Sequence, residues 1–321
     1  MRALRLGGWT VLGLALAGPV VVHAQRLPAP STAPAAGPAQ PVLWHKMTAA
    51  IEARAAAAEG VVAVCIVDLT DGSRYALHGD QVFAVASTIK LTILAELLRQ
   101  AESGMLSLSE TLTLRPQDVI AGSAIVAGLL GPPGSASPLR PISLRELAVY
   151  MITTSDNTAT NALIDRLGMA AINGLSARLG LTQTRLRRRM LDADAVKRGH
   201  ENTATACELA TLLHKLWQPA TLTEATRRDL LHILSQPKDS FLARGLPDEQ
   251  ALASKPGSLD GLRAEAGIVQ IAGRPFVLAV IAAFSPDGAA AERTLADIAR
   301  IAHQYFATIA GNTPLGRRQP G

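Results

Sequence analysis

Hydrophobic and polar positions divide this chain into strand-like segments near both ends and helix-like segments between them. Residues 43–59 have a helical pattern, which Gly60 ends. Two strands are predicted next, at residues 61–69 and 73–78, because both segments flank the Asp71-Gly72 turn signal. The N-terminal part is therefore predicted to be a helix followed by a β-hairpin.

The C-terminal part has a similar set of elements. Residues 264–271 and 276–284 predict a second hairpin around Gly273, and residues 289–309 predict a helix. Strands at the two ends must pair with one another to bury their apolar faces. The predicted fold is α/β, as an α+β sandwich. It has an antiparallel sheet built from both chain ends, flanking helices, an inserted all-helical lobe and an active site in the cleft between the two parts.

The middle of the chain has an almost wholly helical pattern. Three capping-box sequences, each a Ser or Thr followed three residues later by Glu, predict helix starts: Ser143 with Glu146, Thr205 with Glu208, and Thr221 with Glu224. Gly168 and Gly180 stand where helices should stop.

The N-terminal residues predict export. Arg2 and Arg5 precede an apolar stretch that ends in the small-residue pattern Val22-His23-Ala24, so residues 1–24 are interpreted as a secretory signal peptide. A membrane anchor is the alternative, but the apolar run is interrupted and falls short of the roughly 20 residues that span a bilayer. We expect a secreted or periplasmic protein, free of the membrane after cleavage near Ala24.

The remaining boundaries follow from composition. Residues 25–41 are rich in Pro and Ala and predict an extended linker. The catalytic domain is expected over residues 42–311, with an α/β part at 42–87 and 249–311 and a helical part at 88–248. Residues 312–321 are expected to form a flexible tail.

The net charge and the spacing of possible metal ligands limit which partners and cofactors are expected. The net charge is +5, and four arginines crowd into residues 185–189, but no aromatic interleaving or binding motif accompanies them. A solvated loop is the preferred interpretation, and no nucleic-acid partner is expected. The seven histidines are scattered without ligand spacing, so we expect no metal and no cofactor. The protein is expected to be a monomer.

Cys65 lies in an apolar strand-like run and Cys207 in a helix-like run. An exported chain permits a disulfide between them. Both are nevertheless interpreted as small buried hydrophobic residues that form no bridge.

Three short stretches far apart in the chain carry the candidate chemistry: Ser87-Thr88-Ile89-Lys90, Ser155-Asp156-Asn157 and Lys255-Pro256-Gly257. A helical pattern follows Ser87, which places Ser87 at a helix N-terminus with Lys90 on the same face. A serine hydroxyl must lose its proton to a base as it attacks, and a buried lysine with a lowered pKa can be that base. In isolation Ser87 would be interpreted as an N-cap and Lys90 as a surface lysine. The apolar approach to Ser87 and the apolar helix behind it favour the catalytic interpretation.

In this order the three motifs resemble those of class A β-lactamases and penicillin-binding proteins. The stretch of residues 42–311 resembles the class A β-lactamase-related serine hydrolases as a whole. The resemblance implies that Ser155 carries the proton to the leaving nitrogen and that Asp156 is structural. It also implies that Asn157 binds the substrate amide and Lys90, and that Lys255 binds the substrate carboxylate or assists Ser155.

The resemblance also implies an oxyanion hole made by the backbone N–H groups of Ser87 and Ser258, the residue after Gly257. Gly257 and Lys255 would lie on the strand that lines the opposite wall. Arg263 is a candidate second carboxylate clamp because of its fork geometry, or else an exposed arginine at a strand end.

Two departures from the family pattern affect the mechanism. Pro256 replaces a Thr or Ser, which removes a hydroxyl that would bind the substrate carboxylate, and it fits a strand only where its position donates no ladder bond. Class A enzymes carry Glu-x-x-Leu-Asn in the loop before Thr203, whereas here Arg189 falls near the position of that glutamate. Asp192 is the best substitute as deacylation base, or else it only holds the loop together, and Arg189 could pair with it. Asp194 and Glu201, in the same loop, are weaker candidates.

The leading hypothesis is a serine β-lactamase, an antibiotic-resistance enzyme of β-lactam catabolism that hydrolyses penicillins or cephalosporins through a Ser87 acyl-enzyme. The alternative is a penicillin-binding, D-Ala-D-Ala peptidase-like serine hydrolase with slow deacylation, which the missing glutamate supports. A third hypothesis is a binding protein that keeps the fold without full activity.

Overall fold

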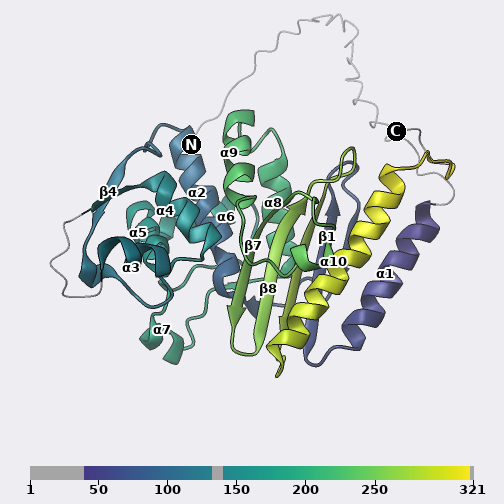
Figure 1. Cartoon of the computed structure of the whole chain (residues 1–321), viewed down its shortest axis with the longest axis horizontal. Coiled ribbons are helices and arrows are strands. Elements are labelled where there is room, and N and C mark those ends of the chain that lie inside the picture. The colour runs from purple at the N-terminus through teal and green to yellow at the C-terminus, as the bar shows by residue number, and fades with distance from the viewer. Residues whose placement is uncertain (1–39, 132–139, 319–321) are drawn as a thin grey trace, which may run out of the picture. The chain divides into compact units, whose positions relative to one another are not determined.

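A five-stranded antiparallel sheet, in the order β2-β1-β9-β8-β7, carries both cores of the structure (Figure 1). The structure is a computed structural model and describes residues 40–131 and 140–318. The strands are β1 (Val61–Asp68), β2 (Arg74–Leu77), β7 (Leu252–Leu259), β8 (Leu262–Val269) and β9 (Phe276–Ala283). The N-terminal strand β1 pairs with the C-terminal strand β9 over its whole length. The predicted sheet built from both chain ends is therefore confirmed.

Helices α1 (Gln40–Ala56) and α10 (Gly288–Ala310) lie side by side over one face of the sheet (Figure 1). Ile51 of α1 and Phe306 of α10 share one buried cluster with the strands, and the Phe306 ring stacks on Phe276 at a centroid distance of 4.1 Å. The opposite face packs against α8 (Ala206–Trp217). Because both faces are covered, β9 is buried at every position.

The central segment is helical, as predicted, and surrounds α2 (Lys90–Glu102). Helix α2 contacts α4, α5, α6 and α9, and it is buried around most of its circumference, as expected for a core helix. The helices of this segment, besides α2 and α8, are α3 (Ala124–Leu130), α4 (Leu144–Thr153), α5 (Asn157–Leu167), α6 (Met169–Arg178), α7 (Ala193–Lys197) and α9 (Glu224–Leu234). Short 3-10 turns are η1 (Ala86–Ile89), η2 (Pro116–Asp118) and η3 (Ala243–Gly245).

Two short strand pairs complete the helical part. Strand β3 (Phe83–Ala84) pairs with β6 (Thr203–Ala204), and β4 (Thr111–Leu114) pairs with β5 (Arg140–Ser143). The first pair joins the segment just before Ser87 to the end of the 185–202 loop. This loop is therefore anchored beside the site it was predicted to serve.

The predicted helix starts have three different outcomes. Ser143 and Glu146 form the complete capping box of α4. Thr205 caps α8, but the Glu208 carboxylate accepts from the backbone N–H groups of residues 183 and 184 and does not return to the cap.

The prediction that Thr221 caps the next helix is wrong, because the N-cap of α9 is Thr223. The Glu102 carboxylate accepts from the Thr223 N–H at 2.8 Å and from the Thr226 hydroxyl at 2.7 Å. This contact from α2 determines where α9 begins, and a local sequence pattern cannot reveal it.

Two segment boundaries in the structure differ slightly from the predicted ones. Helix α1 begins at Gln40, before the expected start at residue 43, and Pro41 is accommodated in its first turn, where a missing N–H costs nothing. Residues 312–318, expected as a flexible tail, close a turn in which Asn312 bridges Arg318. The signal peptide and most of the linker lie outside the described residues. In the described ranges, no helix is both long and apolar enough to span a bilayer.

Candidate active site

The three sequence motifs meet at one cleft of about 460 Å³. Its lining includes six of the predicted site residues, from three separate elements: Ser87, Ser155, Asn157, Lys255, Gly257 and Ser258. Lys90 lies directly behind this lining, and its ammonium group contacts Ser155 and Asn157. Pro256, a departure from the family pattern, also lines the cleft, and so do Asp239 and Phe241. Lining residues that the sequence interpretation did not single out are Gly122, Thr153, Thr154 and Glu292.

Ser87 lies in η1, the 3-10 turn that leads directly into the buried helix α2. Its side chain is half-buried, so it is accessible from the cleft. The preceding residue, Ala86, has a φ of 47°, a left-handed conformation that non-glycine residues rarely adopt. Backbone strain of this kind persists where the surrounding structure over-determines it and often marks functional sites.

Strand β7 passes very close to Ser87, which explains Gly257. A Cβ atom at Gly257 would lie 2.7 Å from Thr88 Oγ1 and 2.9 Å from the Ser87 backbone nitrogen. No larger residue fits there without moving the strand away from η1. Glycine at this position therefore brings the backbone of β7 against the nucleophile.

Pro256 fits the strand because β7 is the edge of the sheet. It pairs in register with Glu265 without interrupting the ladder, so its nitrogen, which has no hydrogen, points to the open edge. Backbone N–H groups alternate in direction along a strand. The N–H of Ser258, two residues later, thus points to the same open edge, where Ser258 lines the cleft.

Lys90 is fully buried and donates three hydrogen bonds. Its Nζ lies 2.7 Å from the Ser155 carbonyl oxygen, 3.0 Å from Ser155 Oγ and 3.0 Å from Asn157 Oδ1. Burial lowers the pKa of Lys90 well below its ordinary value, the charge of Lys255 lowers it further, and Asp156 opposes the shift. Because its pKa is lowered, Lys90 loses its proton more easily than an exposed lysine, and the neutral amine can accept a proton.

The turn between α4 and α5 positions Ser155 and Asn157. Ser155 has a φ of 56°, a second left-handed non-glycine residue in the site. The buried Asp156 carboxylate caps α5 by accepting from the Ala159 N–H at 2.9 Å, and it also accepts from the Val126 N–H at 3.1 Å. Asp156 therefore connects α3 to α5 and holds the turn from both sides.

Lys255 projects from β7 and is only 1% exposed. Its Nζ donates to the Pro256 carbonyl oxygen at 2.7 Å. Burial lowers the pKa of Lys255 to about 7, while Glu265 raises it and Lys238 lowers it further. The charge of Lys255 therefore changes in the neutral pH range.

Glu265 is a fully buried residue near the site that the sequence interpretation missed. One carboxylate oxygen accepts from the hydroxyls of Ser240 and Ser254, both at 2.6 Å, and the other accepts from the N–H groups of Phe241 and Leu242. It thereby joins β8 to β7 and to the segment that places Phe241 in the cleft. The signal in the sequence is a lone acidic residue within the apolar run of β8.

Arg263 does not line the Ser87 cleft, in contrast to its predicted role as a carboxylate clamp. Its Nε donates to Glu292 at 2.8 Å, and its guanidinium also donates to the carbonyl oxygens of Leu259 and Leu262. It lines a separate pocket beside the turn between β7 and β8. These local acceptors hold the side chain away from the nucleophile.

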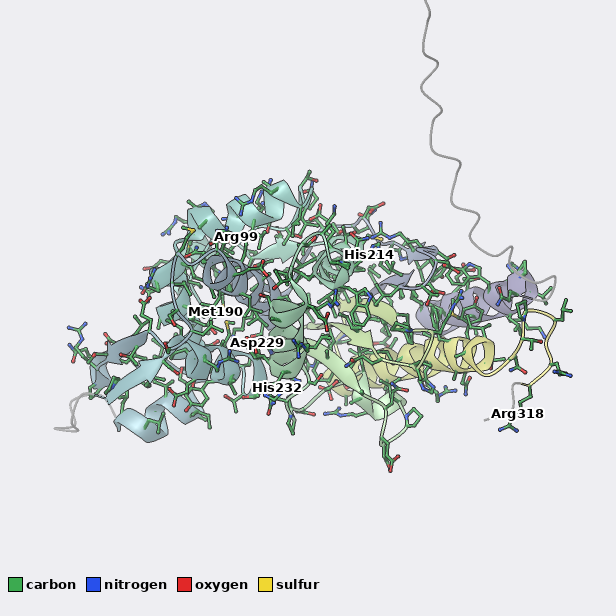
Figure 2. All side chains as sticks on the ribbon, turned by 90° about the horizontal axis from the view of Figure 1, so that it is seen from above. Arg99, Met190, His214, Asp229, His232 and Arg318 are labelled. Carbon is green, nitrogen blue, oxygen red and sulfur yellow. The ribbon has the colours of Figure 1, made fainter. Side chains whose placement is uncertain are left out.

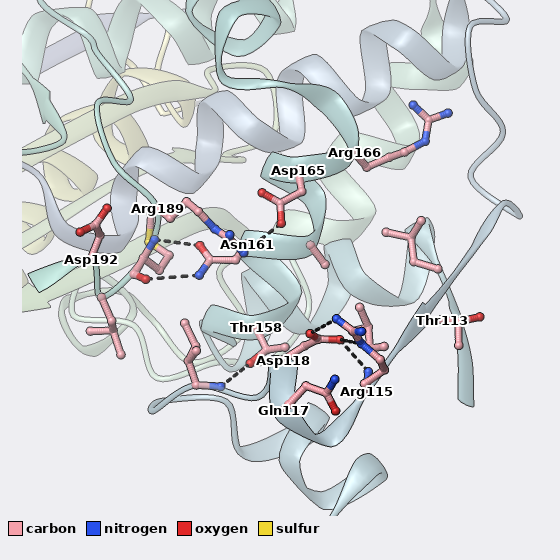
Figure 3. A pocket seen from close by; sticks show the side chains of 16 residues that line it. Thr113, Arg115, Gln117, Asp118, Thr158, Asn161, Asp165, Arg166, Arg189 and Asp192 are labelled. Atoms are coloured by element: carbon pink, nitrogen blue, oxygen red, sulfur yellow. Dashed lines mark hydrogen bonds and ion pairs between the residues drawn. The ribbon is translucent and has the colours of Figure 1, made fainter. Parts of the chain in front are cut away.

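Asp192 also lies outside the Ser87 cleft. Its Oδ1 accepts from the Ala195 N–H at 2.9 Å and caps the short helix α7. Figure 3 shows it at a different pocket, of about 760 Å³, bordered by β4, η2, α5 and residues 189–192. This geometry favours the loop-holding interpretation over that of a deacylation base.

Arg189 pairs with Asp165 at 2.9 Å and not with Asp192, so the pairing considered from the sequence is wrong (Figure 3). Asn161 of α5 positions this part of the loop, because it accepts from the Met190 N–H at 2.8 Å and donates to the Met190 carbonyl at 3.3 Å. Asp194 and Glu201, the weaker candidates, pair with Lys197 and Arg188.

None of the loop carboxylates at positions 192, 194 and 201 lines the Ser87 cleft. The carboxylates that do line it, within the described residues, are Asp239 and Glu292. Both are paired with Arg244, at 2.6 Å and 2.7 Å, and Glu292 also accepts from Arg263.

Comparison with known proteins agrees with this geometry. Residues 46–306 match the family model of the beta-lactamase enzyme family. The chain belongs to this family. The predicted resemblance is thereby confirmed, and this β-lactamase family member can be set beside its relatives.

The chain is 27% identical over 250 residues to β-lactamase CARB-3 of Pseudomonas aeruginosa, which covers 76% of this chain and 84% of that protein. Among solved structures, the β-lactamase of Sphaerobacter thermophilus matches with a TM-score of 0.72 and 28% identity, over 83% of this chain and 98% of that one. A variant of PBP-A, solved as an acyl-enzyme complex with penicillin G, matches with the same TM-score, identity and coverage. Relatives of this β-lactamase family member thus include a protein that has been solved with penicillin G as an acyl-enzyme.

No metal site is evident in the part of this β-lactamase family member that the structure describes. No group of three or more His, Cys, Asp or Glu side chains in those residues could hold an ion. His214 and His232 lie at separate places on α8 and α9 (Figure 2).

Proposed function

We propose that this protein is a serine β-lactamase of class A type that hydrolyses the β-lactam amide of penicillins and cephalosporins through a Ser87 acyl-enzyme. The observation that carries the proposal is the meeting of Ser87, Ser155 and Lys255 at one cleft, with the buried Lys90, whose pKa burial lowers, directly behind them. This arrangement supplies a nucleophile, a base, a proton carrier and a cation for an anionic substrate.

In the proposed acylation, Ser87 Oγ attacks the lactam carbonyl carbon and neutral Lys90 takes the Ser87 proton. The Ser87 and Ser258 N–H groups stabilise the developing oxyanion. As the C–N bond breaks, Ser155 Oγ protonates the leaving nitrogen and is reprotonated by Lys90, whose Nζ lies 3.0 Å away. The proton lost by Ser87 thus ends on the opened lactam nitrogen.

Asn157 and Lys255 are proposed to bind the substrate. The Asn157 Nδ2 donates to the Ala121 carbonyl at 3.1 Å, which orients the side chain, and Gly122 leaves room for it. Lys255, when protonated, attracts the substrate carboxylate. Pro256 provides no hydroxyl for that carboxylate, so the lysine carries more of the recognition than it would beside a Thr or Ser.

Deacylation distinguishes the two candidate functions. Water must attack the Ser87 ester, and the carboxylates lining the cleft in the described residues are paired with arginine. This observation favours, as the second candidate, a penicillin-binding peptidase-like enzyme in which the acyl-enzyme is long-lived. The two candidates share every acylation residue and differ in how fast the ester is hydrolysed.

A time course of penicillin and cephalosporin hydrolysis by the purified mature protein, with substrate in large excess, tests the proposal. Sustained turnover that Ser87→Ala lowers at least about 1,000-fold supports the β-lactamase. A burst of one equivalent that stalls, with an acyl adduct on Ser87 in the intact mass spectrum, supports the second candidate. Absence of both turnover and adduct contradicts both candidates.

The biological setting is part of the proposal. Export by the N-terminal signal peptide would place a monomeric enzyme in the periplasm or outside the cell, where it would meet β-lactams and contribute to antibiotic resistance. The division of residues 42–311 into an α/β part and a helical part also stays a prediction. One experiment addresses export: N-terminal sequencing of the secreted protein should begin near Gln25.

A further inference from the structure

We propose that Cys65 and Cys207 form a disulfide bond that joins the sheet to helix α8 in the oxidised protein. This inference is independent of the β-lactamase activity, because neither cysteine lines the Ser87 cleft. It also revises the interpretation of the two residues as separate hydrophobic side chains.

The fold brings the two thiols together from opposite layers. Cys65 lies in β1, pairs with Ala76 of β2 and belongs to the buried cluster on the α8 side of the sheet. Helix α8 packs directly on β1, and Cys207 lies in its first turn. Cys65 and Cys207 are both buried in the same hydrophobic cluster, and both are free thiols in the structure.

Neighbouring atoms restrict the Cys207 side chain. The Cys207 N–H donates to the Gly79 carbonyl at 2.9 Å, and a Cβ at Gly79 would lie 2.5 Å from Cys207 Sγ and 3.0 Å from the Ala76 Cβ. Ala76 is the residue opposite Cys65 in the sheet. The Cys207 sulfur therefore lies beside Gly79 and Ala76, next to the strand position of Cys65.

The surroundings favour Cys207 as the thiolate. Cys207 lies near the N-terminus of α8, which stabilises negative charge, and the Arg74 guanidinium donates to its carbonyl oxygen at 3.1 Å. The hydrogen bond from Cys65 lowers the pKa of Cys207, Arg74 lowers it further, and burial and Asp80 oppose this. The same pairing raises the pKa of Cys65. One thiol is thus prepared to attack while the other keeps its proton.

The reaction is thiol–disulfide exchange with an external disulfide, such as oxidised glutathione or an oxidised dithiol oxidase. Cys207 thiolate attacks one sulfur of the oxidant, forming a mixed disulfide and releasing the other sulfur as a thiol. Cys65, after losing its proton, attacks Cys207 Sγ and displaces the second oxidant thiol. The oxidant gains the two electrons and two protons that the cysteines lose.

The bond would stabilise the surroundings of the active site. Cys207 follows closely on β6, which pairs with β3 immediately before Ser87. A link from α8 to β1 therefore holds the β6–β3 pair against the sheet. It also closes a loop of more than a hundred residues, for which the entropic stabilisation of a disulfide is large.

The test uses the full mature protein. It is incubated with excess oxidised glutathione at pH 8, denatured, and labelled with a thiol-reactive maleimide before intact mass spectrometry. We expect no label after oxidation and two labels after reduction. Cys207→Ser should instead give one label under reduction and a glutathione adduct or one label under oxidation, and the double variant Cys65→Ala with Cys207→Ala should give none in either state.

Thermal unfolding of the wild-type protein provides a second readout. We expect reduction to lower the Tm of the wild-type protein by about 5–15 °C, from the stabilisation usual for a long loop and the usual Tm sensitivity of domains of this size. The double variant should not respond to reductant. Two labels persisting after oxidation with an unchanged Tm, or a disulfide-linked dimer on a non-reducing gel, would overturn the proposal.

Discussion

At the residue scale, the chemistry depends on two lysines that the fold almost completely removes from solvent. Lys90 is 0% exposed and Lys255 is 1% exposed, and burial is the main cause that lowers the pKa of each. Water would stabilise their charged forms, so burying them destabilises the folded state. In the proposed mechanism, that same burial makes Lys90 a base.

Replacing Lys255 by Met should stabilise the protein, and more so at low pH. Below about pH 7, Lys255 is charged in both the folded and the unfolded state, so its burial cost is fully present. Between about pH 7 and 10.5, the unfolded state binds more protons than the folded state, and wild-type stability rises with pH. We expect Lys255→Met to raise the Tm clearly at pH 6 and less at pH 9, by roughly 2–4 °C per kcal/mol of stabilisation.

The comparison is made by thermal melts of both proteins at the two pH values. An equal Tm difference at pH 6 and pH 9 would contradict a folded-state pKa near 7. Activity provides the matching readout, because Lys255→Met should weaken substrate binding most below pH 7.

Asp192 offers a second test at this scale. Since its carboxylate caps α7 through the Ala195 N–H, and Asn caps helices nearly as well as Asp, Asp192→Asn should leave β-lactam turnover within about twofold. Asp192→Ala should cost about 1 kcal/mol of stability through the lost cap. A fall of 100-fold or more in the hydrolysis rate of Asp192→Asn would restore Asp192 as the deacylation base.

At the element scale, the site is assembled where elements end. Ser87 lies in the turn before α2, Ser155 and Asn157 at the junction of α4 and α5, and Lys255 on the edge strand β7. Buried carboxylates hold these junctions together, with Asp156 between α3 and α5 and Glu265 between β8, β7 and the 240–242 segment.

Substitutions at Glu265 should therefore separate the effect of its charge on stability from the effect of its hydrogen bonds. In Glu265→Gln the amide oxygen can accept from the Phe241 and Leu242 N–H groups, while the amide nitrogen donates to the two serine hydroxyls, which can reverse. We expect Glu265→Gln to lower the free energy of unfolding by about 1 kcal/mol. Glu265→Ala should lower it by about 3–5 kcal/mol, because it leaves four donors unpaired in a buried site.

Denaturant unfolding of the two variants measures these losses. Glu208→Gln is a matched control, because Glu208 also accepts from two backbone N–H groups but does not perturb Lys255. Similar destabilisation by Gln and Ala at Glu265 would show that the charge, and not the hydrogen-bond pattern, is what matters.

At the scale of the whole molecule, the sheet and the helices of the central segment share one core. A single buried cluster includes Ala63 and Ala266 of the sheet together with Leu94 of α2 and Leu147 of α4. Helix α8, from the middle of the chain, packs on β1, β8 and β9. Neither part can lose its packing without exposing apolar surface of the other.

We therefore predict one cooperative unfolding transition for residues 40–318. Differential scanning calorimetry should show a single peak with equal calorimetric and van't Hoff enthalpies. Two resolved peaks would instead indicate that the α/β part and the helical part unfold separately.

Much of this architecture could be predicted from local patterns. The two hairpins, the flanking helices and the pairing of the chain ends followed from alternation, turn signals and the need to bury apolar strands. The capping box at Ser143 was predictable because all its partners lie within four residues. The capping box predicted at Thr221 was wrong for the opposite reason, because a carboxylate of α2, distant in the sequence, fixes the start of α9.

The sequence by itself determined the family, the sheet built from both ends and the three motifs, because residue type, spacing and periodicity are properties of the chain. Tertiary structure decided which side chains reach the cleft. It directed Arg263 to Glu292 and made Asp192 a helix cap, and it placed Cys65 and Cys207 in one buried cluster. Each of these outcomes depends on contacts and burial between residues far apart in the sequence, which no local pattern encodes.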